Sequence, residues 1–437
     1  MTTFIRYLRV FLHQPDGTRA PIGYMSQYGD ILRLSFDNDY IENSRRPTLS
    51  LAYVGETEAQ TRTILSANRD LRLVNSGGRL PPYFANLLPE AHNRTRLANQ
   101  RGCDEDDEFE LLAAAGHDLL GAIEVEPASM GDPIPDEVRL WHATQGLDVL
   151  EPGFVDTPVE DGASLPGVVT KFSAIQDGRR YLVKRHGEAG DTILKLPSTR
   201  HPDLVANEFA GYQLCNAVGL DCAEAEVISR EAAELPEKVP FNDILAVKRF
   251  DRGPAGKRIH VEEFAQAINI MPRRKYGKGL GIDYPLLIRA LDVYSPNRVQ
   301  DIEEFIRRVA TFVLMGAVDM HLKNWAFIYR DGRSPNLAPI YDPVCITAYF
   351  EDAEANYYTL NRSIDAEMQK LTFDDIEGLL TRAGINRAGT YVRKAREVVQ
   401  HAQAVWPALL KDVPGNMAKS IRERLDGKVA LASGYRH

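Results

Sequence analysis

Cysteine is scarce in this chain of 437 residues, and its spacing argues against two kinds of site. The four cysteines are scattered, and no two of them form a C-x-x-C pair: Cys103, Cys215, Cys222 and Cys345. A disulfide framework or a tetrahedral zinc site needs cysteines at closer, paired spacings. We therefore expect a protein of a reducing compartment that has neither site.

Long apolar runs are also missing. The longest one, residues 309–318, has ten residues, whereas a helix that crosses a bilayer needs about 20. The segment from Met1 to Arg6 lacks the apolar core of a signal peptide. We therefore expect a cytoplasmic protein without a membrane partner. A net charge of −9 also argues against direct binding of a polyanion such as DNA.

Glycine-rich phosphate-binding motifs are absent as well. The chain has no G-x-G-x-x-G and no G-x-x-x-x-G-K-[ST], which excludes a Walker P-loop and an ordinary kinase glycine loop. It also lacks the G-x-S-x-G of many hydrolases and the H-E-x-x-H of zinc proteases. The remaining candidate for a loop over phosphates is the segment from Gly162 to Phe172, where small residues precede a predicted strand.

The most informative segment that is present runs from Val318 to Asn324. It places Asp319 five residues before Asn324, the spacing found in the catalytic loop of protein kinases. In phosphoryl transfer, one carboxylate orients the acceptor hydroxyl, while an amide oxygen and a second carboxylate hold Mg²⁺ against the ATP phosphates. We predict an ATP- and Mg²⁺-dependent kinase with Asp319 as base and Asn324 and Asp342 as metal ligands.

A predicted β-hairpin joins the two metal-ligand candidates. Its strands are residues 325–329 and 337–341, on either side of a turn-rich segment. Because a hairpin brings its ends together, Asn324 and Asp342 are expected to lie side by side, as a shared cation requires. Taken singly, such residues are more often loop caps or turn starters, but the hairpin favours the metal site. His321 is counted among the candidate cofactor-binding residues, and it either stiffens the loop or is a buried structural histidine, with equal weight.

A kinase also needs a lysine on a strand to hold the nucleotide phosphates. Lys195 lies in a predicted strand, and Glu208 on the next predicted helix has the position to pair with it. A lysine on a strand more often faces solvent, so Lys195 alone is a weak signal. Lys184 is the nearest alternative for the same role.

The predicted elements indicate an α+β chain. Proline, glycine and aspartate accumulate at 127–135 and 151–162, so we place a domain boundary near residue 150. A helix is predicted from Asp106 to Ala115, and a second one starts at a capping Asp203 and closes at Gly219. Strands are predicted at 4–12, 31–35, 181–184, 191–196 and 244–250, with the third and fourth adjacent.

These elements divide the chain into two parts. Residues 1–150 are expected to form an N-terminal mixed β/α domain, and residues 151–437 a bilobal protein-kinase-like domain. Within the second part we expect a nucleotide-binding lobe at about 151–260 and a mostly helical catalytic lobe at about 261–437.

The motifs, in this order, resemble the HipA-like serine/threonine kinases of bacterial toxin–antitoxin modules. The resemblance spans nearly the whole chain and includes Asn86 to Glu90 and Phe109 to Ala113 in the N-terminal part. The later motifs that carry it are 193–197, 207–208, 246–252, 275–277, 319–324 and 341–342.

The resemblance implies the same roles for Asp319, Asn324 and Asp342, and makes Lys195 the phosphate-binding lysine. It also implies that the strand ending at Arg249 and Phe250 is the hinge that meets adenine through its backbone.

The family's nucleotide loop has the pattern Ser-x-x-Gly-x-Gln-x-Lys. Ser164, Gly167 and Lys171 match it, whereas Val169 replaces the glutamine. Ser164 corresponds to the family's regulatory serine, whose autophosphorylation expels the loop and silences the kinase. A phosphate carries about −1.5 to −2 charges, which disfavours a loop that holds ATP phosphates. The chain also has Lys248 where a glutamate is common.

The resemblance implies a protein substrate in translation, such as an aminoacyl-tRNA synthetase. It also implies a HipB-like helix-turn-helix antitoxin, through which alone the chain would meet DNA. The residues by themselves indicate only phosphoryl transfer, and a small-molecule phosphotransferase would use the same Asp-x4-Asn spacing. A corepressor bound to the antitoxin, with weak or lost kinase activity, is the alternative from another class.

Overall fold

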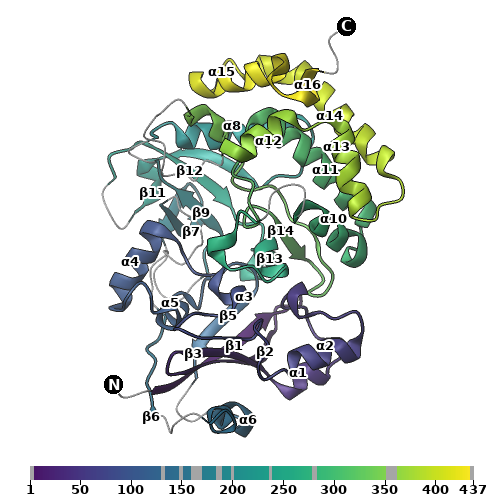
Figure 1. Ribbon diagram of the computed structural model, residues 1–437. Coiled ribbons are helices and arrows are strands. Elements are labelled where there is room, and N and C mark those ends of the chain that lie inside the picture. Colours follow the sequence, from purple (N-terminus) through teal and green to yellow (C-terminus); the bar gives the residue numbers. More distant parts are fainter. Residues whose placement is uncertain are drawn as a thin grey trace.

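The computed structural model describes nine segments of the chain: residues 4–128, 133–146, 151–158, 170–183, 189–197, 201–235, 239–277, 283–350 and 362–433. They form an α+β structure, as predicted. In Figure 1 the N-terminal sheet lies at the bottom, a second sheet lies above it, and the late helices gather at the top and right.

The N-terminal sheet is antiparallel in the order β4-β3-β2-β1-β5, and β6 pairs with β1 in parallel. The predicted strands at 4–12 and 31–35 are confirmed as β1 and β3, but β2 was missed. Pro21 and Gly23 interrupt the apolar pattern of β2, opposite a register shift in β1. Gly23 is required because an added Cβ would lie 2.0 Å from the Ser35 carbonyl oxygen. The strands are β1 (Phe4–His13), β2 (Arg19–Tyr28), β3 (Ile31–Phe36), β4 (Val74–Asn75), β5 (Ile123–Pro127) and β6 (Glu151–Pro152).

Short helices accompany this sheet. The predicted helix near 106–115 is confirmed as α5, where the Asp107 side chain accepts a hydrogen bond from the Glu110 N–H (3.1 Å) and caps the first turn. The helices are α1 (Asn38–Glu42), α2 (Glu58–Leu65), α3 (Pro82–Ala85), α4 (Ala91–Arg101), α5 (Glu108–Ala115), α6 (Asp136–Arg139) and α7 (Trp141–Thr144), with the 3-10 turn η1 (Leu51–Tyr53).

The second sheet has the order β10-β12-β9-β7-β8-β11, and α8 (Leu204–Ala217) contacts its strands β10 and β12. The prediction that residues 181–184 and 191–196 are adjacent strands was wrong, because β7 lies between them. Asp203 stands at the N-terminus of α8 without capping it; its carboxylate instead accepts a hydrogen bond from Asn416 (3.0 Å). The strands are β7 (Lys171–Asp177), β8 (Arg180–Val183), β9 (Thr192–Lys195), β10 (Ala225–Ser229), β11 (Ala233–Glu234) and β12 (Asp243–Lys248).

A small third sheet contains the predicted hairpin. Phe327 pairs with Leu337 across it, and β13 pairs with β14 on the other side. The strands are β13 (His260–Glu263), β14 (Ala326–Tyr329) and β15 (Asn336–Leu337).

Helices form most of the remaining described chain. They are α9 (Phe264–Ala267), α10 (Asp283–Tyr294), α11 (Arg298–Met315), α12 (Arg362–Lys370), α13 (Phe373–Arg382), α14 (Ala388–Leu409), α15 (Gly415–Glu423) and α16 (Ala430–Ser433). No helix in the described part of the chain combines the length and apolarity that a bilayer crossing needs.

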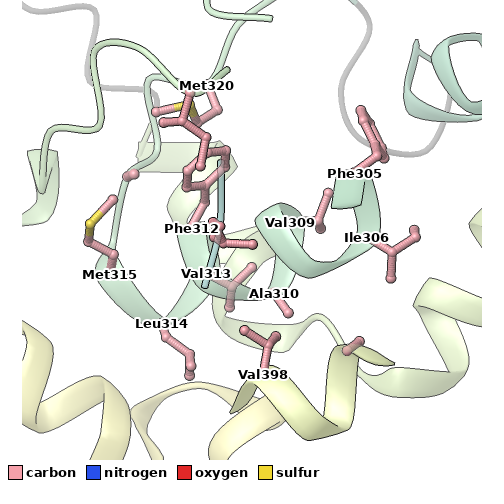
Figure 2. Close-up of a cluster of buried hydrophobic side chains, with 14 of the residues drawn as sticks. Phe305, Ile306, Val309, Ala310, Phe312, Val313, Leu314, Met315, Met320 and Val398 are labelled. Carbon is pink, nitrogen blue, oxygen red and sulfur yellow. The ribbon is translucent and has the colours of Figure 1, made fainter. Parts of the chain in front are cut away.

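Helix α11 is the centre of the helical core. Phe305, Val309, Phe312 and Val313 are almost fully buried, and Val398 of α14 belongs to the same cluster (Figure 2). Each such side chain contributes about 1.5–3 kcal/mol on burial. Gly316 ends the helix with a left-handed φ of 73°, so the chain turns sharply into the segment that carries Asp319. The core therefore fixes where that segment starts.

Candidate active site

The centre of the site is a buried group of charges around Lys195. The Lys195 side chain reaches from β9 to Glu208 on α8, where Nζ donates to Oε1 at 2.5 Å, and also donates to Asp342 Oδ1. The predicted pair of Lys195 and Glu208 is thus present, and it includes a metal-ligand candidate. Lys184, the alternative, lies outside the described residues.

The charges in this group shift one another's protonation. Burial opposes the ionised form of Asp342, but Lys195 and then Lys171 outweigh it and lower the pKa to about 2. Burial likewise opposes the charge on Lys195, yet Asp342 and Glu208 raise its pKa above the ordinary value. Lys171 lies directly opposite Lys195 in the β7–β9 pair, and burial lowers its pKa. Asp342 is therefore a carboxylate at neutral pH.

The backbone at Asp342 is left-handed, with φ of 54°. Such a conformation is uncommon outside glycine and is maintained by its surroundings. Here the Asp342 N–H donates to the Tyr212 hydroxyl (3.2 Å), and the Asn207 amide brackets Cys345 with bonds of 2.9 and 3.1 Å. An added Cβ on Gly211 would lie 1.7 Å from the Pro343 carbonyl oxygen. Helix α8 thus holds the segment after the hairpin by direct contact.

A tight loop presents Asp319 and Asn324. The Asp319 carbonyl oxygen accepts hydrogen bonds from the His321 N–H (2.8 Å) and from Asn324 Nδ2 (2.7 Å). Because the NH₂ group of Asn324 is used in this bond, its Oδ1 is the atom suited to a cation. The Tyr341 hydroxyl donates to the Lys323 carbonyl oxygen (2.9 Å) and ties the loop to the far end of the hairpin.

The Asp319 carboxyl group accepts a hydrogen bond from the Tyr276 hydroxyl at 3.0 Å. Burial raises the pKa of Asp319 to about 6, and the charge of Asp342 adds to this effect, while Tyr276 and Lys275 partly oppose it. A pKa close to the working pH suits a general base. The charge of Asp342 acts on Asp319, so the loop and the end of the hairpin lie near each other.

His321 is neutral, because burial and then Lys275 and Lys323 lower its pKa to about 3. Its Nδ1 accepts a hydrogen bond from the Lys323 N–H (3.2 Å), and its ring meets Tyr276 edge-on. The first contact lies within the loop and the second joins the loop to Tyr276, and both favour the loop-stiffening interpretation. A direct contact of His321 with a cofactor stays a prediction.

The remaining predicted site residues are placed as follows. Ser164 and Gly167 lie outside the described residues. The Arg249 guanidinium is buried between Asp118 and Asp251, with bonds of 2.7 to 2.9 Å, and the Arg249 N–H donates to the Asp191 carbonyl oxygen. Any role of Arg249 toward a nucleotide is thus limited to its carbonyl group. The Phe250 ring packs near Tyr341, and its backbone role stays a prediction.

Two features of the site received no role from the sequence. Tyr276 contacts the predicted base, and Glu90 reaches the loop from the N-terminal region through Lys275 and Lys323. Both residues lie in motifs that carry the resemblance. Their contacts span 43 to 233 positions along the chain, so spacing alone gave no signal for them.

Two family models match the chain. The HipA N-terminal domain matches residues 9–126, and the HipA-like C-terminal domain matches residues 163–406, more than half of the sequence. The chain belongs to the HipA-like family. Its kinase-like function follows from the relatives below.

One relative, "Putative kinase Y4dM" of Sinorhizobium fredii, is 34% identical over 92% of both chains. The serine/threonine-protein kinase toxin HipA of Shewanella oneidensis is 24% identical over 88% of this chain and 90% of its own. The solved complex of S. oneidensis HipA with HipB and operator DNA aligns over 98% of this chain and 97% of that one, at 17% identity and a TM-score of 0.64. The HipA-like chain therefore shares this fold.

Proposed function

We propose that this HipA-like chain is an ATP- and Mg²⁺-dependent serine/threonine protein kinase. The observation that carries the proposal is the ion-pair group at Lys195, whose ammonium group joins Glu208 and Asp342, and the charge of Asp342 in turn acts on Asp319. A strand lysine paired with a helix glutamate, a catalytic-loop aspartate and a second metal-binding aspartate are the parts that protein kinases use.

The donor set fits Mg²⁺, which prefers oxygen ligands. Asp342 is ionised and its side chain is one-third exposed, and Asn324 Oδ1 is the second ligand. When bound, the cation neutralises charge on the ATP phosphates. Lys195 holds the phosphates, and Asp319 accepts the proton of the acceptor hydroxyl.

We also place the domain boundary near residue 150, with the nucleotide-binding lobe at about 151–260 and the helical lobe at about 261–437. The apolar clusters support the boundary near residue 150, because one lies between Leu8 and Val155 and the largest begins at Ala210. The largest cluster extends to Ala432 and includes residues of both proposed lobes. Ser164, Gly167 and Lys171 are assigned to the nucleotide loop, with Ser164 as an autophosphorylation site. The proposed location is the cytoplasm.

The S. oneidensis relative was solved with HipB and operator DNA. On that basis we propose a HipB-like antitoxin as partner, with DNA met through it. The proposed substrate is a protein of translation, such as an aminoacyl-tRNA synthetase.

The test is transfer of radiolabelled phosphate from ATP with Mg²⁺, to the chain itself and to proteins of a lysate. Wild type is expected to label protein, and Asp319→Asn to lose at least about 100-fold of the rate. Asp331→Asn, at the hairpin turn away from the site, is the matched control and should behave as wild type. Equal labelling by wild type and Asp319→Asn, or no labelling by either, would contradict the proposal. The corepressor bound to the antitoxin would then be the alternative function. Label found only on small molecules would indicate a small-molecule phosphotransferase.

Mass spectrometry tests the regulatory serine separately. Phosphate is expected on Ser164 after incubation with ATP, and Ser164→Ala should remove it. An unmodified Ser164 in an active kinase would contradict regulation at this position.

A further inference from the structure

Glu90 joins the N-terminal region to both sides of the catalytic loop. Its Oε2 accepts a hydrogen bond from Lys275 Nζ at 2.9 Å, and its Oε1 lies 3.8 Å from Lys323 Nζ. Oε1 is buried and has no hydrogen-bond partner among the described residues. Burial opposes the ionised form of Glu90, but Lys323 and Lys275 keep its pKa below the ordinary value. One carboxylate thus faces two ammonium groups.

Each of these lysines directly precedes, in the chain, a residue of the candidate site. Lys275 precedes Tyr276, whose hydroxyl donates to Asp319, and the Lys275 carbonyl oxygen accepts from the Leu322 N–H (2.9 Å). Lys323 precedes Asn324 and is almost fully buried.

The Lys323 ammonium group also contacts other parts of the chain. It donates to Glu263 (2.7 Å) and to the Asn86 carbonyl oxygen (2.8 Å). Tyr276, which contacts the proposed base, and Asn324, the proposed metal ligand, are thus each held through the lysine that precedes them. Glu90 contacts both lysines.

We propose that Glu90 is a positioning residue for phosphoryl transfer, acting through Lys275 and Tyr276 on Asp319 and through Lys323 on Asn324. The inference rests on the proposed function. Without the Glu90 carboxylate, Glu263 would be left to balance both ammonium groups, and their mutual repulsion would act in a poorly solvated space, where it is strong. The loop would relax to separate them. A shift of about 1 Å in a reacting group can cost about 100-fold in rate.

Glu90 is not needed to dock the N-terminal region. That region is also held by Asp118, which accepts hydrogen bonds from Arg249 (2.7 Å) and Arg252 (3.0 Å), and by Arg258, which donates to the Ile123 carbonyl oxygen (3.2 Å). Loss of Glu90 should therefore disturb the loop while the domains stay together.

The experiment compares Glu90→Gln, Glu90→Asp and Glu110→Gln in the full chain. Glu110 is the matched control, because its carboxylate also holds two cations, Arg6 and Arg101, but lies on α5 away from the loop. For Glu90→Gln we expect kcat to fall about 10- to 100-fold, with the KM for ATP within about twofold because the Lys195 group is untouched. Glu90→Asp keeps the charge and should recover most of kcat.

Hydrogen exchange of residues 319–324 is the second readout and needs no activity. Exchange should be faster in Glu90→Gln than in wild type or Glu110→Gln. Wild-type exchange and kcat in Glu90→Gln would overturn the inference. If kcat falls, the KM for ATP rises and global stability falls together, or if Glu90→Asp does not recover kcat, the role of Glu90 is structural only. If wild type transfers no phosphate, the proposed function fails, while the exchange data still decide whether Glu90 orders the loop.

Discussion

Two buried groups of charges in this molecule have similar composition and different surroundings. At the interface of the N-terminal region, Arg249 and Arg252 pair with Asp118 and Asp251, and none of the four side chains is more than 5% exposed. In the candidate active site, Lys195 pairs with Glu208 and Asp342. Two of these side chains are equally buried, but that of Asp342 is 33% exposed.

The difference in exposure distinguishes a charge group that stabilises the fold from one that can bind a ligand. The interface group is closed by further hydrogen bonds to the carbonyl oxygens of Leu119 and Gly121. The site group instead includes a partly exposed carboxylate on a left-handed backbone, a combination typical of functional sites. Substitutions in the first group should change stability, and substitutions in the second should change activity.

The largest effect is expected at Asp342. Asp342→Asn should lower phosphoryl transfer by about 1,000-fold, equivalent to about 4 kcal/mol, because the proposed metal ligand is lost. Stability should change far less, since asparagine tolerates the left-handed backbone and Lys195 remains paired with Glu208. Rates at saturating Mg²⁺ and urea unfolding check the two parts. A large loss of stability with normal activity would reverse the assignment of the two groups.

The next effect concerns the interface group. Asp118→Asn removes a negative charge that Arg249 and Arg252 share. Breaking a buried ion pair costs about 3–5 kcal/mol. Urea unfolding should show this loss, while the folded fraction keeps its rate of transfer. Asp177→Asn, at the exposed end of β7, is the control and should unfold like wild type. Stability unchanged in Asp118→Asn would show that the closed group contributes little.

A third prediction uses Glu262, a buried carboxyl group between the two regions. It accepts hydrogen bonds from the Leu51 N–H (2.9 Å) and the Tyr329 hydroxyl, and burial raises its pKa from 4.5 to about 7. Between these values the folded state binds more protons than the unfolded state. Stability should therefore fall as pH rises through this window, by up to about 3 kcal/mol, and stay lower above it.

The measurement is the difference in unfolding free energy between wild type and Glu262→Gln at pH 5 and pH 8. Because glutamine mimics the protonated acid, the variant should lose this part of the pH dependence. Equal pH dependence in both proteins would show that Glu262 does not titrate in this window.

The smallest effect is expected for an exposed ion pair. Lys248 contacts Glu224 at 3.2 Å, with side chains 60% and 78% exposed. Lys248→Met should change the free energy of unfolding by less than about 1 kcal/mol, and the change should vanish at high salt. Thermal unfolding at two salt concentrations checks this. A loss of unfolding free energy as large as that of Asp118→Asn would show that exposed and buried ion pairs contribute equally to stability.

Local patterns predicted much of this structure. The hairpin around residues 330–335 and the acidic start of α5 follow from turn and cap chemistry between near neighbours. The order of β7, β8 and β9 did not, because strand adjacency depends on the whole sheet. Arg249 was assigned to the adenine-contacting hinge from the family resemblance, while the ion-pair partner of its side chain, Asp118, lies 131 positions away. Contacts at such separations leave no periodic signal in a single sequence.

Helix α8 has a consequence for how the site assembles. Glu208 and Gly211 lie three residues apart, so one face of this helix holds the lysine partner and also sets the approach of the Asp342–Pro343 turn. Any rotation of α8 would break the Lys195–Glu208 contact and at the same time displace the turn that packs on Gly211. Lys195 and Asp342, the proposed phosphate-binding lysine and cation ligand, therefore behave as one mechanical unit, which is either assembled or not.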